Sequence, residues 1–299
     1  MNAIEIKGLT KTFGTHRVLD HMDLSVPAGS VFGLVGENGA GKTTTMKIIL
    51  GLMPKDSGSI EIFGEDASRS RAAVGYLPDV PSFYGDMNAR EYMTLCGGIG
   101  GIDKDILKPR IDELLKLVGI ENAKTRVSNY SRGMKQRLGI AQALLTKPDI
   151  LICDEPTSAL DPSGRKDILD IIRGLGGDTT VIFSTHILSD VEKICDRVAL
   201  LHDGHIVMCG QIDELENSHR TNEIAVEFGS ADETKRFAAA LAEAGCPYRA
   251  DRNTVIAAGS KALGNGETII DILYNEKIVP LRMDALEPDL EKLFMEMIK

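Results

Sequence analysis

Two patterns of apolar residues mark the strands that the chain is expected to form. Residues 4–6 and 18–26 alternate apolar and polar side chains, as strands with one buried face do. Residues 31–35 are instead short and continuously apolar, and residues 149–153 and 180–184 are mainly apolar, which indicates strands that are buried on both faces. A strand of the second kind needs a covering layer on each side of its sheet.

Helical periodicity fills the stretches between these strands. Residues 42–50 and 163–173 are predicted helices, and residues 86–145 are predicted to be mainly helical. Asn88, followed three residues later by Glu91, has the spacing of an N-terminal capping pair. Buried strands that alternate with helices predict an α/β fold around a parallel sheet.

The chain changes character near residue 211. Before it, Asp203-Gly204 predicts a tight hairpin turn. The polar segment 211–221 is a predicted linker, and the glycine-rich residues 96–101 are a predicted flexible connection. We therefore expect a first domain over residues 1–215, with a helical subdomain at about 86–146, and an accessory domain over residues 222–299.

The accessory domain has its own order of elements. Strands are predicted at 223–228, 248–250, 254–257 and 278–283, and helices at 233–244 and 267–274. This βαββαβ order is the split-βαβ, ferredoxin-like pattern of a small α+β domain. A last amphipathic helix is predicted over 288–298, with Pro288 near its start.

Composition narrows the classes of function. The chain has 299 residues, and 34 Lys and Arg against 44 Asp and Glu give a net charge of −10, which disfavours nucleic acid as a partner. No apolar stretch approaches the ~18 residues that span a bilayer, and the first residues lack the apolar core of a signal peptide. We expect a cytoplasmic chain whose link to a membrane runs through a partner. The five cysteines have no metal-binding spacing and are expected to be reduced thiols.

A phosphate-binding loop is the clearest motif. Gly36-Glu-Asn-Gly-Ala-Gly-Lys-Thr43 fits G-x-x-x-x-G-K-[ST] between a buried strand and a helix. Glycines let the backbone amides turn toward one anion, and the N-terminus of the helix adds its positive end. Lys42 would reach the β- and γ-phosphates, and Thr43 would hold Mg²⁺. The expected nucleotide contacts here are Gly36, Glu37, Asn38, Gly39, Ala40, Gly41, Lys42, Thr43 and Thr44.

Two carboxylates end the strand at residues 149–153. Asp154 would lie at the ligand-binding edge of an α/β sheet and orient Mg²⁺, and Glu155 is the candidate general base for an attacking water. Alone, such a pair is more often a plain strand cap, but the preceding phosphate loop favours the catalytic interpretation. His186 ends the neighbouring strand and would lie near the γ-phosphate, although a lone histidine there is usually a core or cap residue.

At this point the residues match a family. Asn129-Tyr-Ser-Arg-Gly-Met-Lys-Gln-Arg137 resembles the signature of ATP-binding cassette (ABC) transporters, and Asp154-Glu-Pro-Thr-Ser-Ala-Leu-Asp-Pro162 follows at the expected distance. The resemblance covers about residues 3–215. It implies a P-loop NTPase core with a mixed sheet and a helical subdomain. It also implies that Phe13 stacks on adenine, that Asp161 belongs to the D-loop and that His186 is the switch histidine.

The resemblance further implies how the protein works. Ser131 and Gly133 of the signature contact the nucleotide held by a second copy, so that ATP binding closes a homodimer and hydrolysis of ATP opens it. Such subunits are peripheral on the cytoplasmic face and energise separately encoded membrane permease subunits. The signature, the acidic residue at position 79 and the appended domain resemble the exporter-type, ABC-2-like subset, whose members serve antibiotic, bacteriocin or lipid export.

Some departures and alternatives stay open. Arg132 and Met134 replace the usual glycine and glutamine of the signature. Asp79 stands where the family has a glutamine that touches Mg²⁺ and the membrane subunit, so either a metal contact or only a place in the coupling loop is expected. A soluble ABC-type ATPase for DNA, ribosomes or cluster assembly is the alternative function. The accessory domain is expected to pack or to stabilise a dimer, with ligand sensing as the alternative.

Overall fold

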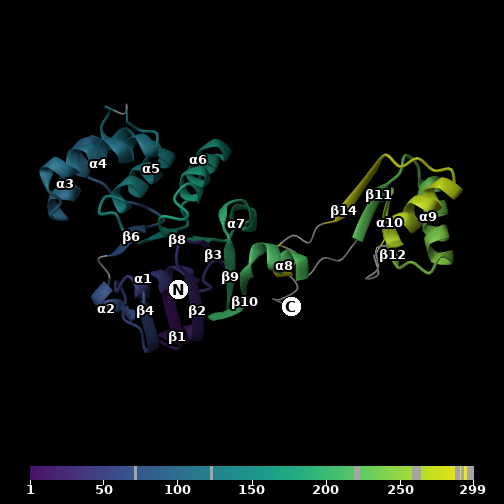
Figure 1. The fold of residues 1–299 in the computed structure, drawn as a ribbon, viewed down its shortest axis with the longest axis horizontal. Coiled ribbons are helices and arrows are strands. Elements are labelled where there is room, and N and C mark those ends of the chain that lie inside the picture. Colours follow the sequence, from purple (N-terminus) through teal and green to yellow (C-terminus); the bar gives the residue numbers. More distant parts are fainter. Residues whose placement is uncertain are drawn as a thin grey trace. The chain divides into compact units, whose positions relative to one another are not determined.

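The computed structural model of the chain describes residues 1–70, 73–121, 124–218, 223–257, 264–286, 290, 293 and 294. The chain divides into two units, one over Met1–Ile212 and the other from Asp213 onward. Figure 1 labels most of the helices and strands of both.

An antiparallel sheet begins the first unit. β1 (Asn2–Phe13) pairs with β2 (His16–Pro27) on one side and with β4 (Ser57–Ile62) on the other, and β5 (Glu65–Asp66) extends the edge beyond β4. Buried and exposed side chains alternate along much of β1 and β2. The predicted alternation over residues 4–6 and 18–26 is confirmed, because one face of this sheet turns toward a core.

A six-stranded sheet forms the centre of the first unit, in the order β10-β9-β3-β8-β7-β6. Its strands are β3 (Val31–Val35), β6 (Val74–Leu77), β7 (Ile150–Asp154), β8 (Thr180–Thr185), β9 (Arg197–His202) and β10 (His205–Gln211). All neighbouring pairs are parallel except β9 and β10, which form the predicted hairpin, with φ of 45° at Asp203 and 78° at Gly204. Every residue of β3, β7 and β8 is buried, as their apolar runs predict.

Helices cover both faces of this sheet. α1 (Lys42–Ile49) lies between the two sheets, since Met46 shares one hydrophobic core with Ile4 of β1 and Ile152 of β7. The opposite face carries α5, α6 and α7, which Figure 1 shows on the other side of the sheet from α1. Their bounds are Arg132–Ala143, Pro162–Arg173 and Leu188–Ile194.

The predicted helical subdomain contains α3 (Ala89–Ile99), α4 (Lys104–Leu117), a short 3₁₀ turn (Val127–Asn129) and α5. The Asn88–Glu91 capping pair forms: Glu91 N donates to the Asn88 side chain at 3.0 Å, and Asn88 N donates to the Glu91 carboxylate at 2.9 Å. α2 (Ala67–Ser70) is a separate short helix.

The sequence predicts a flexible connection at the glycine-rich run 96–101, and this prediction is wrong for residues 96–99. α3 continues to Ile99, and Gly97 lies directly against the Leu107 side chain of α4, where a Cβ would overlap it. The glycine therefore permits close helix packing there, as well as the turn at Gly101, where φ is 70°.

The second unit begins with another correction. The sequence predicts a linker over residues 211–221, but α8 spans Ile212–Ser218. Buried Ile212 anchors the start of this helix, and the other residues of α8 are mostly polar, which hides it from the periodicity of apolar residues. Residues 219–222 lie outside the described residues.

A split-βαβ arrangement follows, as predicted. Its elements are β11 (Glu223–Glu227), α9 (Ala231–Glu243), β12 (Tyr248–Asp251), β13 (Thr254–Ala257), α10 (Gly264–Asn275) and β14 (Arg282–Leu286). The four strands form one antiparallel sheet in the order β12-β13-β11-β14. Phe228, Phe237 and Val255 belong to the core of this unit.

The last strand begins later than expected. Ile278, predicted to be in the strand, instead closes the end of α10, with its N–H donating to the Leu273 carbonyl at 2.9 Å and its side chain in the core. This is a helix C-terminal contact, so the strand starts only at Arg282. The predicted helix over 288–298 lies largely outside the described residues. Leu290 and Leu293, which fall within it and are described, are buried.

All five cysteines lie in described segments and are unpaired. Burial raises the pKa of the Cys153 and Cys195 thiols, so both stay protonated. In the described part of the chain, no helix combines the length and the apolar character that crossing a bilayer requires.

Gly75 in β6 offers a test of the contact between α5 and the sheet. A Cβ at Gly75 would overlap the Ala143 carbonyl oxygen, which is main chain and cannot turn away. We expect Gly75→Ala to lower the free energy of unfolding by about 1–3 kcal/mol. The measurement is urea denaturation followed by circular dichroism.

Gly98→Ala is the matched control. Gly98 lies in α3, and a Cβ added to it would have no other atom within 4 Å, so alanine should leave stability unchanged or raise it by about 0.5–1 kcal/mol. Equal stability of both variants would contradict the close contact at Gly75.

Candidate active site

The loop between β3 and α1 needs its glycines for two reasons. Gly39 and Gly41 have φ of 92° and 109°, in the left-handed region that other residues rarely adopt. A Cβ at Gly36 would overlap the Leu201 carbonyl oxygen of β9, and one at Gly41 would lie 2.7 Å from Leu19. The loop can take this curled form only with glycine at these positions.

The start of α1 is suited to bind an anion. Its N-cap is Gly41, which has no side chain to cap the helix, and the amides of Lys42, Thr43 and Thr44 have no acceptor within the helix. Lys42 is only 6% exposed, and its Nζ donates to the Gly36 carbonyl at 2.6 Å and to the Glu37 carbonyl at 3.1 Å. Unused amides and a buried ammonium fit the phosphates of a nucleotide.

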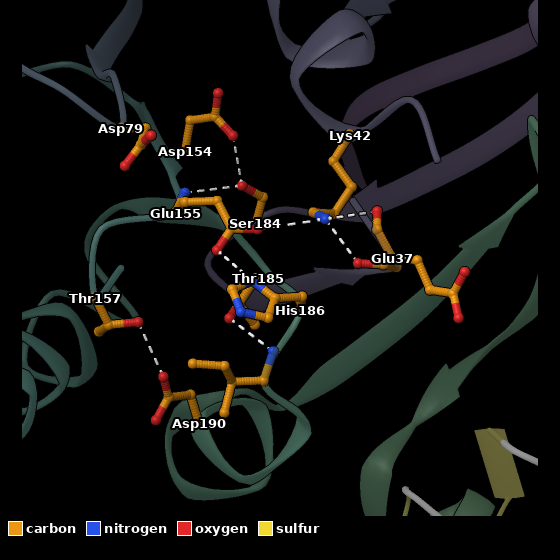
Figure 2. A network of polar contacts seen from close by, with 12 residues as sticks. Glu37, Lys42, Asp79, Asp154, Glu155, Thr157, Ser184, Thr185, His186 and Asp190 are labelled. Carbon is orange, nitrogen blue, oxygen red and sulfur yellow. Dashed lines mark hydrogen bonds and ion pairs between the residues drawn. The ribbon is translucent and has the colours of Figure 1, made fainter. Parts of the chain in front are cut away.

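Three oxygen atoms meet at the end of β7. The Thr43 hydroxyl donates to Asp154 Oδ1 at 3.1 Å, and the Ser184 hydroxyl donates to the same oxygen at 2.7 Å. Asp154 and Ser184 are buried, and Figure 2 shows the hydrogen bond between them. A carboxylate beside a hydroxyl, next to a phosphate loop, is a donor set that fits Mg²⁺, which otherwise takes phosphate and water oxygens.

Glu155 joins the phosphate loop to His186. Its Oε1 lies 3.3 Å from Lys42 Nζ, and its Oε2 lies 3.0 Å from His186 Nδ1. Figure 2 shows this chain of side chains from three different elements. The structure therefore brings together Lys42, Glu155 and His186, which were predicted from three separate motifs.

The backbone at Glu155 is strained and held in place. Its φ is 47°, which is unusual for a residue with a side chain. Its N–H donates to Ser184, to the hydroxyl at 3.0 Å and to the carbonyl at 3.2 Å. Ser184 thus holds the Asp154 carboxylate and the Glu155 backbone at once.

Sequence reasoning missed Ser184 and a second group behind it. The Asp190 carboxylate is fully buried and accepts from Thr157 Oγ1 at 2.9 Å and from Arg165 Nε at 2.7 Å. This contact fixes the segment after Glu155 to α6 and α7. No motif marks these residues, because an isolated serine or a Thr–Asp–Arg triplet spread over 33 residues is invisible until the fold assembles it.

Asp79 follows β6, whose parallel neighbour β7 ends at Asp154. Burial raises the pKa of the Tyr76 phenol to about 12, and the negative charges of Asp154 and Asp79 add to this shift. Both carboxylates therefore act on the same region. The Asp79 side chain itself pairs with Arg132 Nη2 at 3.1 Å.

The signature residues gather elsewhere. Ser131 caps α5, accepting from Met134 N at 3.2 Å. Ser131, Gly133 and Asp161 line a hollow of about 250 Å³ with other residues of α5, the D-loop and α6. None of residues 36–44, all of which are described, lines this hollow. The predicted nucleotide contacts thus form two groups in one chain.

Phe13 lies at the end of β1 rather than in a free loop, and its side chain is 46% exposed. The Lys11 ammonium lies 5.4 Å from its ring centroid. An exposed ring at this position is suited to stacking on a base.

Comparison with known proteins agrees with this geometry. The model of the ABC transporter family matches residues 19–158. The bacitracin transport ATP-binding protein BcrA of Bacillus licheniformis is 36% identical over 305 residues, which cover 99% of this chain and 97% of BcrA. The daunorubicin resistance ATP-binding protein DrrA3 of Streptomyces coeruleorubidus is 31% identical over 301 residues, covering 99% of this chain and 95% of the relative.

Solved structures give the same result for the first unit. A structure described as the ATP binding subunit of an ABC transporter matches with a TM-score of 0.64 and 30% identity, over 72% of this chain and 92% of that chain. CbiO1 from Clostridium perfringens, part of the transporter complex cbiONQ, matches with a TM-score of 0.65 and 25% identity, over 72% and 90%. The chain belongs to the family of ABC transporter ATP-binding proteins, and its first unit is the ATP-hydrolysing nucleotide-binding domain of that family.

Proposed function

We propose that two copies of this chain close on two molecules of MgATP, and that hydrolysis of the ATP lets them separate. The observation that carries this proposal is the division of the nucleotide contacts into a phosphate loop and a separate signature hollow. A second copy would bring its hollow to the phosphate loop of the first. Closure then follows from ATP binding, because only the closed state makes both sets of contacts.

The residues in and around the phosphate loop have distinct roles in this proposal. Lys42 and the amides at the start of α1 bind the phosphates, and Phe13 stacks on the adenine. Thr43 and Asp154 are the proposed Mg²⁺ contacts, and bound Mg²⁺ would neutralise charge on the phosphate oxygens. Glu155 accepts the proton of the attacking water, with His186 bonded to its second oxygen at 3.0 Å.

Lys42 also controls Glu155. The Lys42 ammonium lies 3.3 Å from Glu155 Oε1, so the two side chains form an ion pair. Phosphates in the loop compete for the same ammonium. When Lys42 turns to them, Oε1 of Glu155 is free to accept from the attacking water.

We infer that the cycle energises separate membrane permease subunits, with the chain peripheral on the cytoplasmic face. The names of the two relatives, which refer to bacitracin transport and daunorubicin resistance, support export of a toxic compound of that kind. The net charge of −10 disfavours the alternative of a soluble ATPase that acts on nucleic acid. We assign the nucleotide-binding domain to about residues 1–215 and a packing or dimer-stabilising domain to 222–299.

Glu155→Gln tests the general base. The amide keeps the size of the side chain but cannot accept the proton, so we expect turnover to fall at least about 100-fold while ATP stays bound. With MgATP the variant should run as a stable dimer in light scattering, and without ATP as a monomer. Hydrolysis at the parental rate would contradict the role of Glu155.

Ser131→Arg tests the signature hollow. A large cation at the start of α5 should block dimer closure in the Glu155→Gln background while ATP binding, measured with a fluorescent analogue, is retained. Ser59→Arg, at an exposed serine of β4, is the control and should close normally. Normal closure of both would contradict the sandwich.

Ser184→Ala tests the serine that bonds the Asp154 carboxylate and the Glu155 backbone. Loss of its hydroxyl should lower ATP turnover or raise the Mg²⁺ concentration for half-maximal activity about 10–100-fold. Thr180→Ala removes a buried hydroxyl at the other end of β8, where it accepts from Gly29 N, so it should affect stability but not the Mg²⁺ dependence. Parallel behaviour of the two variants would show that Ser184 has only a structural role.

A further inference from the structure

Two of the three departures from the usual family sequence, Asp79 and Arg132, contact each other. Arg132 Nη2 lies 3.1 Å from Asp79 Oδ1, although the residues are separated by 53 positions in the chain. Arg132 begins α5 in the signature, and Asp79 lies in the coupling loop, defined here as residues 78–85. The contact therefore links the two segments directly within one protomer.

Other residues on the same face of α5 also contact the coupling loop. Gln136, one turn after Arg132, is fully buried, and its Nε2 donates to the Asp79 carbonyl at 2.6 Å. Gly139 follows on the same side, and a Cβ there would lie 2.5 Å from Leu77 and 3.5 Å from Pro81. Positions 132, 136 and 139 have the i, i+4, i+7 spacing of one helix face. That face contacts the end of β6, the side chain and carbonyl of residue 79, and the loop beyond it.

We propose that Arg132 and Gln136 are positioning residues that hold the coupling loop at Asp79, so that the Asp79 carboxylate serves the signature helix and not the metal ion. The proposal rests on the ATP-sandwich function above. We call the three residues Asp79, Arg132 and Gln136 the loop–signature clamp.

Charge explains why the two substitutions belong together. Asp154 and Glu155 already bring two carboxylates to the place where an ATP must bind, and Asp79 lies at the end of the neighbouring strand. A third carboxylate there, if it had no partner of opposite charge, would repel the triphosphate. Arg132 supplies the compensating charge, which the glycine usual at that position could not do.

The clamp does not act mainly through stability. The Arg132 and Asp79 side chains are 40% and 46% exposed, and exposed ion pairs contribute little to folding. Its effect is on position: Arg132 also lines the signature hollow, so the residue that holds the coupling loop borders the surface offered to the nucleotide of the second copy. A push on the loop by a membrane subunit would then move the start of α5.

A double-mutant cycle tests the clamp in the full-length chain. Arg132→Gln leaves Asp79 uncompensated, so we expect the KM for MgATP to rise about two- to five-fold, the range of one exposed ion pair. Adding Asp79→Asn removes the uncompensated negative charge of Asp79 and should return the KM to within about two-fold of the parent. Arg132→Lys keeps the positive charge, so its KM should stay close to that of the parent. This variant distinguishes a need for positive charge from a need for arginine itself.

The matched control is Arg236 and Glu276, an ion pair of similar exposure in the second unit at 3.0 Å. Arg236→Gln should leave the KM for MgATP unchanged. Thermal melting of every variant identifies any that fails to fold, and the Arg132→Lys and Asp79→Glu variants then complete the cycle with both charges kept.

Two results would overturn the clamp. If the fold-change in KM of the double variant equalled the product of the fold-changes of Asp79→Asn and Arg132→Gln, the two residues would act independently. A higher Mg²⁺ requirement in Asp79→Asn, equal with and without Arg132→Gln, would make Asp79 a metal contact. ATP-dependent dimerisation of the parent chain, measured in parallel, tests the proposed function separately, so its failure is distinguishable from failure of the clamp.

Discussion

The site depends on one constraint, the parallel register of β3, β8 and β7. Val35 pairs with Thr185, and Ser184 pairs with Asp154, so the three strands end at the same level of the sheet. The phosphate loop leaves β3 there, the carboxylates leave β7 and His186 leaves β8. A shift of one residue in either pairing would turn Ser184 or Asp154 to the other face, and the contacts among Lys42, Glu155 and His186 would be lost. Both faces of these strands are buried, so a shift would also force side chains into spaces that other residues fill.

The sequence predicted those parts in which local chemistry decides the structure. The apolar runs identified β3, β7 and β8, and the glycine pattern identified the phosphate loop, because no other residue fits its turns. The Asn88–Glu91 cap formed for the same local reason. Errors occurred where tertiary contacts decide: Gly97 is helical and packs on Leu107, and Ile278 leaves the strand to close α10. Ser184 and the Thr157–Asp190 contact were missed because their partners are distant in the chain.

The position of Asp79 shows this limit most clearly. From the sequence, an aspartate in the coupling loop and an arginine in the signature were two unrelated departures, and a metal contact for Asp79 stayed open. The fold brings their side chains to 3.1 Å. At this distance the positive charge of Arg132 compensates the negative charge of Asp79. Neither spacing nor residue type could have linked them, since the two residues are 53 positions apart, with α3 and α4 between them. Sequence patterns report chemistry within one segment, whereas compensation between segments becomes visible only in three dimensions.

Buried and half-buried ion pairs have a second consequence for this ATPase. Lys42 is bonded to two loop carbonyls and also faces Glu155, so the loop, the ammonium and the base form one connected group before any phosphate is considered. Removing a partner from such a group leaves an uncompensated charge, which is costly away from water. A triphosphate is a better partner for Lys42 than one carboxylate, because it carries more negative charge and also uses the amides of α1. In the proposed cycle, binding of ATP supplies the free energy that separates Lys42 from Glu155, and the Glu155 carboxylate leaves this ion pair only when phosphates occupy the loop.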